Sequence, residues 1–446
     1  MGDPSDNATQ QQARMPLGKL LVTFLRPRPL GVLVAAMLLL GIVLRVHAFG
    51  YPDAFMFDEH HFVENARNYI NNKADWNDHP PLGKLIIAQS IEMLGDNSVG
   101  WRIPSLIFGF LTIACGGLAS RRLFRSPGAG WLAAAFLSVD GFLIAYSRAA
   151  LLDGFLAAGL AITLLISTLT VNIWTAIAAG ALLGLSASIK FSGIAVALPI
   201  ITAVIFAKIP KRKLVTLGVI FGATAALCYF MQYSRGLMLA LKSATPVDVV
   251  RDTQRLLDHH AGLTDMKNPW TSGWVTWAIP TRPAMLSYAR NLGEVRVLSG
   301  LGNLALWWPG VLLMIASIVT ILAKGVVAVS SPNVDETDDS DSTSVVTFVQ
   351  DQGRAVLVLL AGCLGFIAPW VITHRDSYIY HFLPAYVAII LLLAGFVDWL
   401  MKRKPIDAMI FVSVVLVVAA FYAPIWSSME TSEAAVNARL FWGAWR

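Results

Sequence analysis

The residues with the clearest capacity for chemistry are two adjacent carboxylates, Asp58 and Glu59, in the segment FDEHHF. A carboxylate pair of this kind can supply a general base that takes the proton of an incoming hydroxyl group. Cationic side chains elsewhere in the chain could hold and neutralise a phosphate leaving group. These cations are Arg102, Arg148, Lys190 and Arg375. Together the two sets suit the transfer of a group from a phosphate to a hydroxyl.

Further polar side chains could support such a site. His79 precedes a Pro-Pro pair, whose rings fix the local backbone. Asp153 could brace Arg148 as its charge partner, and Asp140 stands near the end of an apolar stretch. His381 closes the segment HRDSYIYH, close to the beginning of another apolar stretch. These residues are therefore the candidates that would order the site around the carboxylates and cations.

Each candidate also has a purely structural interpretation. Asp58 and Glu59 could cap a helix, where the helix dipole favours carboxylates, and taken alone this interpretation is the stronger one. Arg148 and Lys190 could merely extend their charged ends to the membrane surface. Arg148 and Asp153 could form a structural ion pair, and the His-Pro-Pro segment could be a turn. What favours a site is the position of all these residues along the chain.

The elements that must position them are membrane-spanning helices. The chain has 446 residues, of which 56% are hydrophobic and 14% charged, whereas a soluble domain averages about 45–50% apolar and about 25% charged residues. A spanning helix needs roughly 20 mostly apolar residues. The predicted spans are 30–48, 100–120, 129–146, 151–169, 172–188, 191–208, 214–233, 303–323, 355–373, 379–398 and 406–425. The sequence thus predicts an all-α polytopic membrane protein of about eleven spans.

Lysine and arginine in the short loops predict the orientation of these spans. Basic residues gather in the polar N-terminus 1–29 and in the loops RRLFR (121–125), KIPKRK (208–213) and KRK (402–404). Alternation of eleven spans puts all four segments on one side, which the positive-inside rule makes the cytoplasm. The acidic, Ser/Thr-rich loop 324–353 falls on the same side and has the composition of a disordered segment.

The long loops 49–99 and 234–302 fall on the outer side, as does a short tail, 426–446. The first loop contains two segments that resemble short amphipathic helices, HHFVENARNYI and LGKLIIAQSIEML. The second is rich in tryptophan, which favours the membrane interface. All the candidate polar residues lie in these loops or at the outer ends of spans. Because ionisable groups beside spans usually face a cavity or a partner, we expect one polar cavity within a transmembrane catalytic domain, 30–425.

The other bulk features exclude some functions. The net charge of +6 reflects basic loops between spans, so we interpret it as a topology signal rather than a nucleic-acid footprint. The three cysteines lie in apolar stretches without metal-ligand spacing. The His60–His61 pair is weak evidence for a metal ion. The sequence therefore predicts no metal site and no cofactor.

Long motifs in this chain resemble the protein O-mannosyltransferases of the GT-C glycosyltransferase superfamily. The resemblance covers about residues 40–395, and its motifs stand in the family order. They are FDEHHFVENARNYI, DHPPLGK, WRIPSLIFGFLT, SVDGFLIAYSRAALLDGFL, SASIKFSG, NPWTSGWVTWAIPTRPAM, GNLALWWPG and YIYHFLPA. The loop 234–302 is too short for the MIR domain of the eukaryotic members, so the chain resembles the bacterial branch. Phe191 stands where the family pattern leads us to expect tryptophan.

The resemblance implies a GT-C-type helical bundle and a metal-independent, inverting transfer of mannose. The donor would be a polyprenyl-phosphate-mannose, and the acceptors Ser or Thr hydroxyls of exported proteins. Asp58 would be the base, and Glu59 would help bind acceptor or donor. The family's cations correspond to Arg102, Arg148 and Lys190, which would serve the donor phosphate or order the site. His381 would lie near the lipid phosphate.

The resemblance also implies location and partners. The chain would be a multi-pass protein of a bacterial plasma membrane, with its N-terminus in the cytoplasm and its active site on the outer face. Partners would be the lipid-linked donor, an exported protein or peptide, membrane lipid and, as a further candidate, the secretion translocon. Two alternatives stay open: a GT-C transferase that modifies a lipid or a cell-wall glycan, and a lipid or sugar transporter. A transporter favours inverted repeats and polar groups at mid-membrane, and neither pattern is visible in this sequence.

Overall fold

A computed structural model describes residues 29–73, 78–241, 244–264, 268–291, 293–330, 343–373 and 375–445. The predicted polar N-terminus, apart from residue 29, and the part 331–342 of the predicted acidic loop lie outside these residues. Within the described residues, seven helices are long and apolar enough to cross a membrane. They are α2 (Pro29–Val46), α5 (Ser98–Leu123), α11 (Lys211–Leu241), α13 (Leu304–Lys324), α16 (Gly353–Ile372), α17 (Leu383–Met401, extended by the 3₁₀ turn η4, Ile379–Phe382) and α18 (Pro405–Trp426).

The other four predicted spans form shorter helices, so the prediction of eleven long spans is only partly confirmed. These helices are α6 (Pro127–Ser138), α7 (Gly141–Tyr146), α8 (Asp153–Ile166), α9 (Ile173–Ala187) and α10 (Ala197–Ile205), which follows the 3₁₀ turn η1 (Phe191–Val196). Polar residues that offer the backbone other hydrogen bonds mark most of the ends. Asp140 begins α7, Asn172 caps α9 through its side chain, and Ser188 ends α9.

The predicted third span is interrupted at Val139, and Asp140 holds the interruption together. One carboxylate oxygen of Asp140 accepts a hydrogen bond from the backbone of Leu143, 3.1 Å away, which caps α7. The other accepts from the backbone of Asn303 at 2.9 Å and from the Tyr386 hydroxyl at 3.1 Å. Asp140 therefore joins α7 to the beginning of α13 and to α17.

Arg45, near the end of α2, satisfies the carbonyl groups that the interruption leaves at the end of α6. Its Nη1 donates to the Ser138 carbonyl at 2.6 Å, and its Nη2 donates to the Leu137 carbonyl at 3.1 Å. The guanidinium is fully buried. Since a lipid interior offers no hydrogen bonds to free carbonyls, this contact lets a broken helix lie within an apolar bundle.

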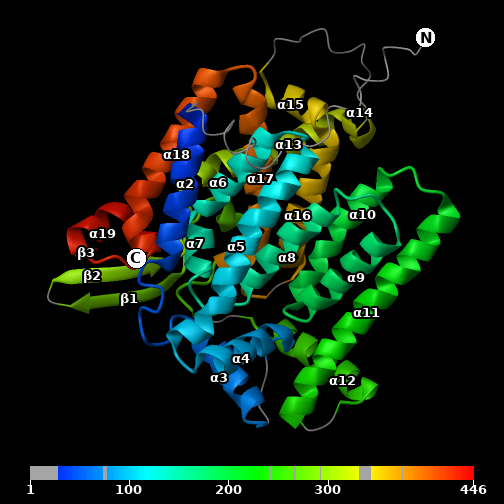
Figure 1. Cartoon of the computed structure of the whole chain (residues 1–446), viewed down its shortest axis with the longest axis vertical. Coiled ribbons are helices and arrows are strands. Elements are labelled where there is room, and N and C mark those ends of the chain that lie inside the picture. Colours follow the sequence, from blue (N-terminus) through cyan, green and yellow to red (C-terminus); the bar gives the residue numbers. More distant parts are fainter. Residues whose placement is uncertain are drawn as a thin grey trace, which may run out of the picture.

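The core of the bundle is α17, whose residues are almost all buried. It packs against α5, α6, α8, α13, α16 and α18. Figure 1 shows α17 running through the middle of the molecule, with α2 and α18 on one side and α11 at the opposite edge. α11 packs mainly on α9 and leaves most of its apolar surface exposed. The exposed apolar surface of the outer helices is typical of a protein surrounded by lipid.

The two long loops carry three helices at one end of the bundle. They are α3 (Glu59–Ile70), α4 (Leu82–Leu94) and α12 (Pro246–Ala261). The first two confirm the predicted helices of the first loop. The short helices α14 (Val326–Ser330) and α15 (Val345–Asp351) lie at the opposite end (Figure 1). The polar segments that the sequence analysis assigned to opposite membrane sides are therefore at opposite ends of the molecule.

A small sheet lies in the second long loop, where the sequence analysis did not predict strands. β1 (Met285–Asn291) and β2 (Glu294–Ser299) form an antiparallel hairpin, and β3 (Thr431–Ser432) pairs with β2. The chain after α18 thus returns to the hairpin, on which α19 (Glu433–Arg439) packs. Two further 3₁₀ turns are η2 (Trp274–Ala278) and η5 (Gly443–Trp445). The loop and the tail consequently form one structured cap beside the bundle.

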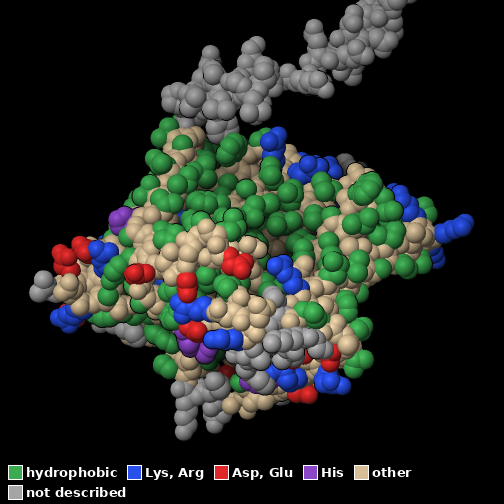
Figure 2. Space-filling view, turned by 60° about the horizontal axis from the view of Figure 1, so that its bottom comes forward, with side chains coloured by type: hydrophobic (Ala, Val, Ile, Leu, Met, Phe, Trp, Pro, Cys, Tyr) green, Lys and Arg blue, Asp and Glu red, His purple; other side chains and the backbone are tan. Residues whose placement is uncertain are grey.

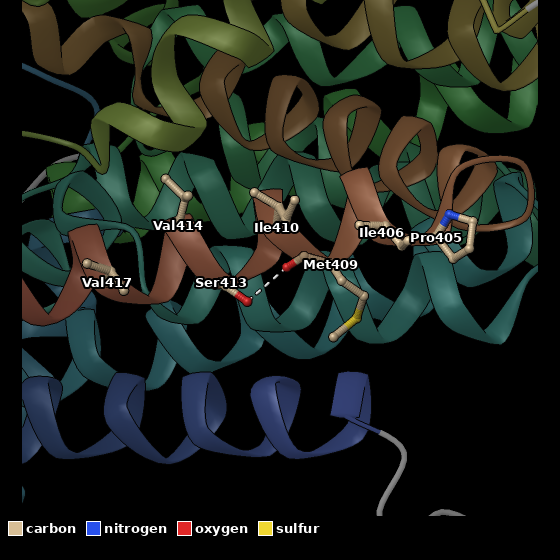
Figure 3. A pocket seen from close by; sticks show the side chains of 7 residues that line it. All are labelled: Pro405, Ile406, Met409, Ile410, Ser413, Val414 and Val417. Carbon is tan, nitrogen blue, oxygen red and sulfur yellow. Dashed lines mark hydrogen bonds between the residues drawn. The ribbon is translucent and has the colours of Figure 1, made fainter.

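A shallow hollow of about 530 Å³ follows the exposed face of α18, beside α2 (Figure 3). Its lining consists of Pro405, Ile406, Met409, Ile410, Ser413, Val414 and Val417. The hydroxyl of Ser413, the one polar side chain in this lining, donates to the Met409 carbonyl of its own helix at 2.9 Å. Because this lining offers neither a charge nor a free polar group, we assign the hollow to lipid contact and not to chemistry.

Candidate functional site

Two adjoining hollows lie at the end of the bundle that carries α3, α4 and α12. The smaller has a volume of about 30 Å³ and contains Asp58 and Asp153 in its wall. The larger has a volume of about 580 Å³ and contains Arg375 and His381. His79 and Lys190 line both. Figure 2 shows histidines and charged side chains gathered toward this end, beside a broad apolar surface. Six of the ten candidate residues thus meet at one place.

Asp58 is half-buried and immediately precedes α3, but it does not cap that helix. Its side chain makes no capping hydrogen bond, and no ion pair or hydrogen bond to it is found among the described residues. Phe57 has a positive φ of 45°, a conformation that non-glycine residues rarely adopt outside constrained sites. Burial raises the pKa of Asp58, and the neighbours His61 and Lys190 oppose that rise. A carboxylate that is free of partners and more basic than usual can accept a proton.

Lys190, in the turn between α9 and η1, forms a buried ion pair with Asp153, the first residue of α8. The Lys190 ammonium lies 2.8 Å and 3.0 Å from the two carboxylate oxygens of Asp153. The predicted pairing of Asp153 with Arg148 is therefore wrong. Lys190 has the reach to bring its charge to the first residue of α8, whereas Arg148 is held elsewhere. The pair places one ammonium group between the two hollows.

Arg148 lines neither hollow and instead binds backbone carbonyls. Its Nη1 donates to the carbonyls of Leu44, Arg45 and His47 at 2.8–2.9 Å, which closes the end of α2. Its Nη2 donates to Ser427 at 3.2 Å, just after α18. The predicted contact of Arg148 with a donor phosphate is thus not supported by its position. Its role is to join the ends of two helices beneath the first loop.

Glu59 and Arg102 form a second buried pair that organises the first loop. Arg102 Nε and Nη2 donate to the two carboxylate oxygens of Glu59 at 2.8 Å and 2.9 Å. The same carboxylate accepts from the backbone of Ala150 at 2.7 Å and of Met56 at 2.8 Å. Arg102 also donates to the carbonyl of Pro52 at 2.8 Å. All the hydrogen-bond donors of Arg102 and all the acceptors of Glu59 are engaged with protein groups. This pair is therefore not available to bind substrate.

This network determines where Asp58 stands. Arg102 ties the loop before α3 to α5, and Glu59 ties the first turn of α3 to Ala150, in the segment between α7 and α8. Asp58 directly precedes Glu59 in the sequence, and Asp153 follows Ala150 by three residues. The adjacent carboxylates Asp58 and Glu59 therefore have different settings: one faces a hollow without a partner, and the other is fully engaged in holding the loop.

The larger hollow is lined by nitrogen atoms that lack hydrogen-bond partners. Among the described residues, Arg375 Nε, Trp370 Nε1 and His260 Nδ1 are buried and make no hydrogen bond. The Arg375 guanidinium lies 5.6 Å from the centre of the Trp370 ring. Burial lowers the pKa of Arg375, and it lowers the pKa of His260 to about 4. Since unpaired buried donors are costly, this hollow is suited to a ligand that accepts hydrogen bonds, such as an anion.

His381 and His79 complete the wall of the larger hollow. His381 stacks on Trp370 with ring centres 3.7 Å apart, and its Nδ1 accepts a hydrogen bond from the backbone of Tyr378 at 3.1 Å. That bond leaves Nε2 as the protonated nitrogen and hence a donor. His79 stacks on His260 with ring centres 5.1 Å apart. Both histidines are thus held by ring packing against other side chains of the site.

The walls also contain Tyr146, His260 and Trp370, which the sequence analysis did not name as site residues. His260 belongs to a second His-His pair, in DHH at the end of α12, and this pair was the available signal. Trp370 stands in an apolar stretch and resembles an ordinary interface tryptophan. Tyr146 directly precedes the segment SRAALLD, and its buried hydroxyl has no partner among the described residues. The described residues contain no group of three or more His, Cys, Asp or Glu that could hold a metal ion.

Comparisons with known proteins identify relatives of this chain. The family model described as dolichyl-phosphate-mannose-protein mannosyltransferase matches residues 78–233. A second, described as the C-terminal four-TMM region of protein O-mannosyltransferase, matches residues 248–445. The polyprenol-phosphate-mannose–protein mannosyltransferase of Mycobacterium tuberculosis is 26% identical over 411 residues, which cover 75% of this chain and 73% of that protein.

Solved structures show the same fold. The Saccharomyces cerevisiae protein O-mannosyltransferase Pmt1–Pmt2 complex, bound to the sugar donor, gives a TM-score of 0.76 at 13% identity, covering 97% of this chain and 94% of that chain. ArnT from Cupriavidus metallidurans, bound to undecaprenyl phosphate, gives 0.52 at 16% identity, covering 88% and 64%. Two models of one family thus match most of the sequence, and the arrangement of helices is GT-C-like. The chain belongs to the protein O-mannosyltransferase family.

Proposed function

We propose that this protein transfers mannose from a polyprenyl-phosphate-mannose donor to Ser or Thr hydroxyls of exported proteins. The family membership and the names of the relatives support the donor and the protein acceptor. The reaction we infer is a single, metal-independent displacement that inverts the anomeric carbon. The observation that carries this proposal is the pair of adjoining hollows, one with a free carboxylate and the other with unpaired nitrogen donors.

The larger hollow would hold the donor phosphate. Arg375 supplies a charge and an unpaired Nε, Trp370 supplies a neutral donor, and His260 adds an unpaired ring nitrogen to the wall. Hydrogen bonds from a guanidinium to a phosphate are among the stronger ones in proteins. Lys190, at the wall shared with the smaller hollow, would stand on the side where the bond to the sugar breaks. These groups would stabilise the negative charge that develops on the departing phosphate.

The smaller hollow would receive the acceptor hydroxyl. Its volume of about 30 Å³ suits one group of the size of a water molecule or hydroxyl. There Asp58 would take the hydroxyl proton as the oxygen attacks the anomeric carbon. Glu59 and Arg102 would act as positioning residues, because their hydrogen bonds are all made within the protein. Arg148 and Asp140 would support helix ends rather than bind substrate.

An apolar stripe on η1 and α10 would guide the prenyl chain. Ile194, Leu198, Ile201 and Ile205 follow one another at spacings of four, three and four residues, and each is at least 40% exposed. Ile194 lines the proposed phosphate cavity. Ile201 and Ile205 line an apolar hollow of about 320 Å³ farther along the same helix. A chain attached to the phosphate would therefore find continuous apolar contact from the cavity to this second hollow.

We also propose the orientation that the basic loops predict. The shorter helices α6–α7, α8, α9 and η1–α10 would complete eleven membrane segments, with the N-terminus in the cytoplasm of a bacterial cell. The site would then open on the outer face of the plasma membrane. Single cysteines introduced at Lys73 in the first loop and at Lys404 after α17 would test this orientation. An impermeant thiol reagent should label the first in intact cells and the second only after lysis, and the reverse pattern would contradict it.

Purified protein in detergent provides the direct test of the function. The assay measures mannose transfer from polyprenyl-phosphate-mannose to a Ser/Thr peptide in the presence of EDTA. It compares the wild type with Asp58→Asn and with Asp53→Asn, which makes the same chemical change at an exposed position of the same loop. We expect transfer by the wild type and by Asp53→Asn, and a loss of about 10²-fold or more in Asp58→Asn.

Each contrary result would remove a different part of the proposal. Absence of transfer by the wild type would argue against the peptide acceptor or the mannose donor, and lipid or glycan acceptors would then be assayed. Full activity of Asp58→Asn would show that Asp58 is not the base. A loss of transfer in EDTA that a divalent cation restores would contradict the metal-independent mechanism.

A further inference from the structure

The wall between the two hollows consists largely of two side chains that could exchange protons, His79 and Lys190. The Lys190 ammonium donates to both oxygens of Asp153, and an ammonium group has no lone pair with which to accept a proton. The ring nitrogens of His79 have no hydrogen-bond partner among the described residues, although Lys84 donates to its backbone carbonyl. Of the two shared residues, only His79 is free to accept a proton on one side and to donate one on the other.

We propose that His79 carries the proton that Asp58 takes from the acceptor across to the departing phosphate. The inference rests on the proposed function and adds a catalytic residue to it. A base that has accepted a proton must lose it before the next turnover. The product phosphate gains an ionisable oxygen when the bond to the sugar breaks. His79 stands between the residue that must release a proton and the group that can receive it.

The steps balance in atoms and charge. The acceptor oxygen forms a bond to the anomeric carbon, and the bond from that carbon to the phosphate oxygen breaks. The hydroxyl proton passes to Asp58, which becomes neutral. His79 then accepts this proton on one ring nitrogen and releases a proton to the phosphate. The donor is a singly charged phosphodiester, and the product leaves as a singly charged, protonated phosphomonoester, while Asp58 returns to its carboxylate form.

The surroundings of His79 favour this role. The charged and titratable groups around it include Asp58 before α3, Lys84 of α4, Asp153 of α8, Lys190 before η1, His260 of α12, Arg375 before η4, Tyr146 of α7, and Tyr380 and His381 of η4. Burial lowers the pKa of His79 well below its usual value, and Lys190 and His260 add to this effect. The imidazole is therefore neutral at neutral pH, so one ring nitrogen is unprotonated, and the ring would hold a transferred proton only briefly. A protonated His79 would return its proton readily, and the new charge on the phosphate would attract it.

The other histidines of the cavity are less suited to this transfer. His381 has its Nδ1 engaged with the backbone of Tyr378. His260 lines the phosphate cavity and not the hollow of Asp58. It stacks on His79 at 5.1 Å and so keeps that ring in place. His79 therefore lines both hollows, whereas His260 and His381 line only the phosphate cavity.

The test compares single and repeated turnover in His79→Gln. With the protein in excess over polyprenyl-phosphate-mannose, one transfer needs only Asp58, so the single-turnover rate should stay within about threefold of the wild type. With substrates in excess, turnover should fall by about 10²-fold, the usual size of a lost proton-transfer group. In His79→Ala, added imidazole should restore repeated turnover. His260→Gln should instead raise the KM for the donor, and His47→Gln, at an exposed position, should match the wild type.

The outcomes distinguish this inference from the function on which it rests. An equal loss in single and repeated turnover would overturn the relay and make His79 a phosphate-binding or structural residue. Undiminished repeated turnover in His79→Gln would overturn it as well. Absence of transfer in the wild type would remove the proposed function, and with it the relay. A wild type that transfers, with a defect confined to repeated turnover in His79→Gln and rescued by imidazole in His79→Ala, would support both.

Discussion

The ammonium group of Lys190 lies within 3.0 Å of both carboxylate oxygens of Asp153, and both side chains are almost completely buried. Removing one member of a buried pair leaves an uncompensated charge and typically costs 3–5 kcal/mol. The pair also stands between the proposed hydroxyl and phosphate hollows. Its structural and functional contributions can therefore be separated by experiment.

We expect Lys190→Met and Asp153→Leu each to lower stability by about 3–5 kcal/mol. The double variant should recover much of that loss, because no charge stays unpaired. Transfer activity should not recover in the double variant, since the cation that faces the phosphate is absent. Thermal unfolding in detergent and the peptide assay measure the two effects. Recovery of activity together with stability would assign the pair a purely structural role.

Arg375 provides a test of the phosphate cavity. Its unpaired Nε lines the larger hollow, so Arg375→Gln removes a charge-assisted hydrogen bond to the donor. Bonds to charged groups contribute about 1.5–3 kcal/mol, which corresponds to roughly a 10- to 100-fold rise in the donor KM. The KM for the acceptor peptide should hardly change. Arg290→Gln, on the exposed hairpin, is the matched control. A rise in the peptide KM instead would place the acceptor in this cavity.

The pH dependence of transfer follows from the setting of Asp58. Burial raises its pKa above the ordinary value of about 3.9, and only the ionised form can act as a base. Activity should therefore be complete above the raised pKa and should fall as the pH drops through it. Measurement of kcat/KM between pH 4 and 8 should show this acidic limb at a higher pH than an unperturbed aspartate would give. A profile without such a limb in this range would argue against Asp58 as the base.

The stripe on α10 predicts a dependence on donor chain length. Ile201→Asn introduces a polar group into the wall of the apolar hollow at the far end of the stripe. It should raise the KM for a long polyprenyl donor by roughly tenfold, the factor that about 1.4 kcal/mol of lost apolar contact gives. A donor with two isoprene units should be almost unaffected. The control is Val417→Asn on α18, which is also exposed to lipid. An equal effect on both donors would contradict this path.

The sequence predicted the multi-pass membrane class correctly because apolar stretches report burial in lipid directly. It predicted four of these stretches as full spans, although the structure makes them shorter helices. In the third predicted span, 129–146, Asp140 was recognised as unusual, but its partners Asn303 and Tyr386 are far away in the chain. A periodicity argument considers neighbours within one helix, so it does not reveal that a polar residue ends one. The hairpin 285–299 was missed for a similar reason, since Trp and Pro residues dominate the pattern of its loop.

The candidate site likewise contains residues that the sequence identified and residues that it assigned wrongly or missed. Residues whose role depends on a local setting, such as Asp58 and His79, were recognisable from their motifs. Arg148 and Glu59 were assigned to substrate because charge type alone does not indicate partners. The partners of Arg148 are backbone carbonyls about 100 residues earlier and near residue 427, and carbonyl groups carry no sequence signal. His260 was missed because it comes from α12 and reaches the site only through tertiary packing.

The contact of Arg45 with the end of α6 has a consequence for how the chain enters the membrane. A lone α2 would carry an uncompensated guanidinium into lipid, and a lone α6 would expose the carbonyls of Leu137 and Ser138 there. When the two segments pack together, Arg45 donates the hydrogen bonds that the carbonyls at the end of α6 accept. The first segment should therefore stay beside the insertion machinery until α6 has been synthesised, so that the two leave for the bilayer as a pair.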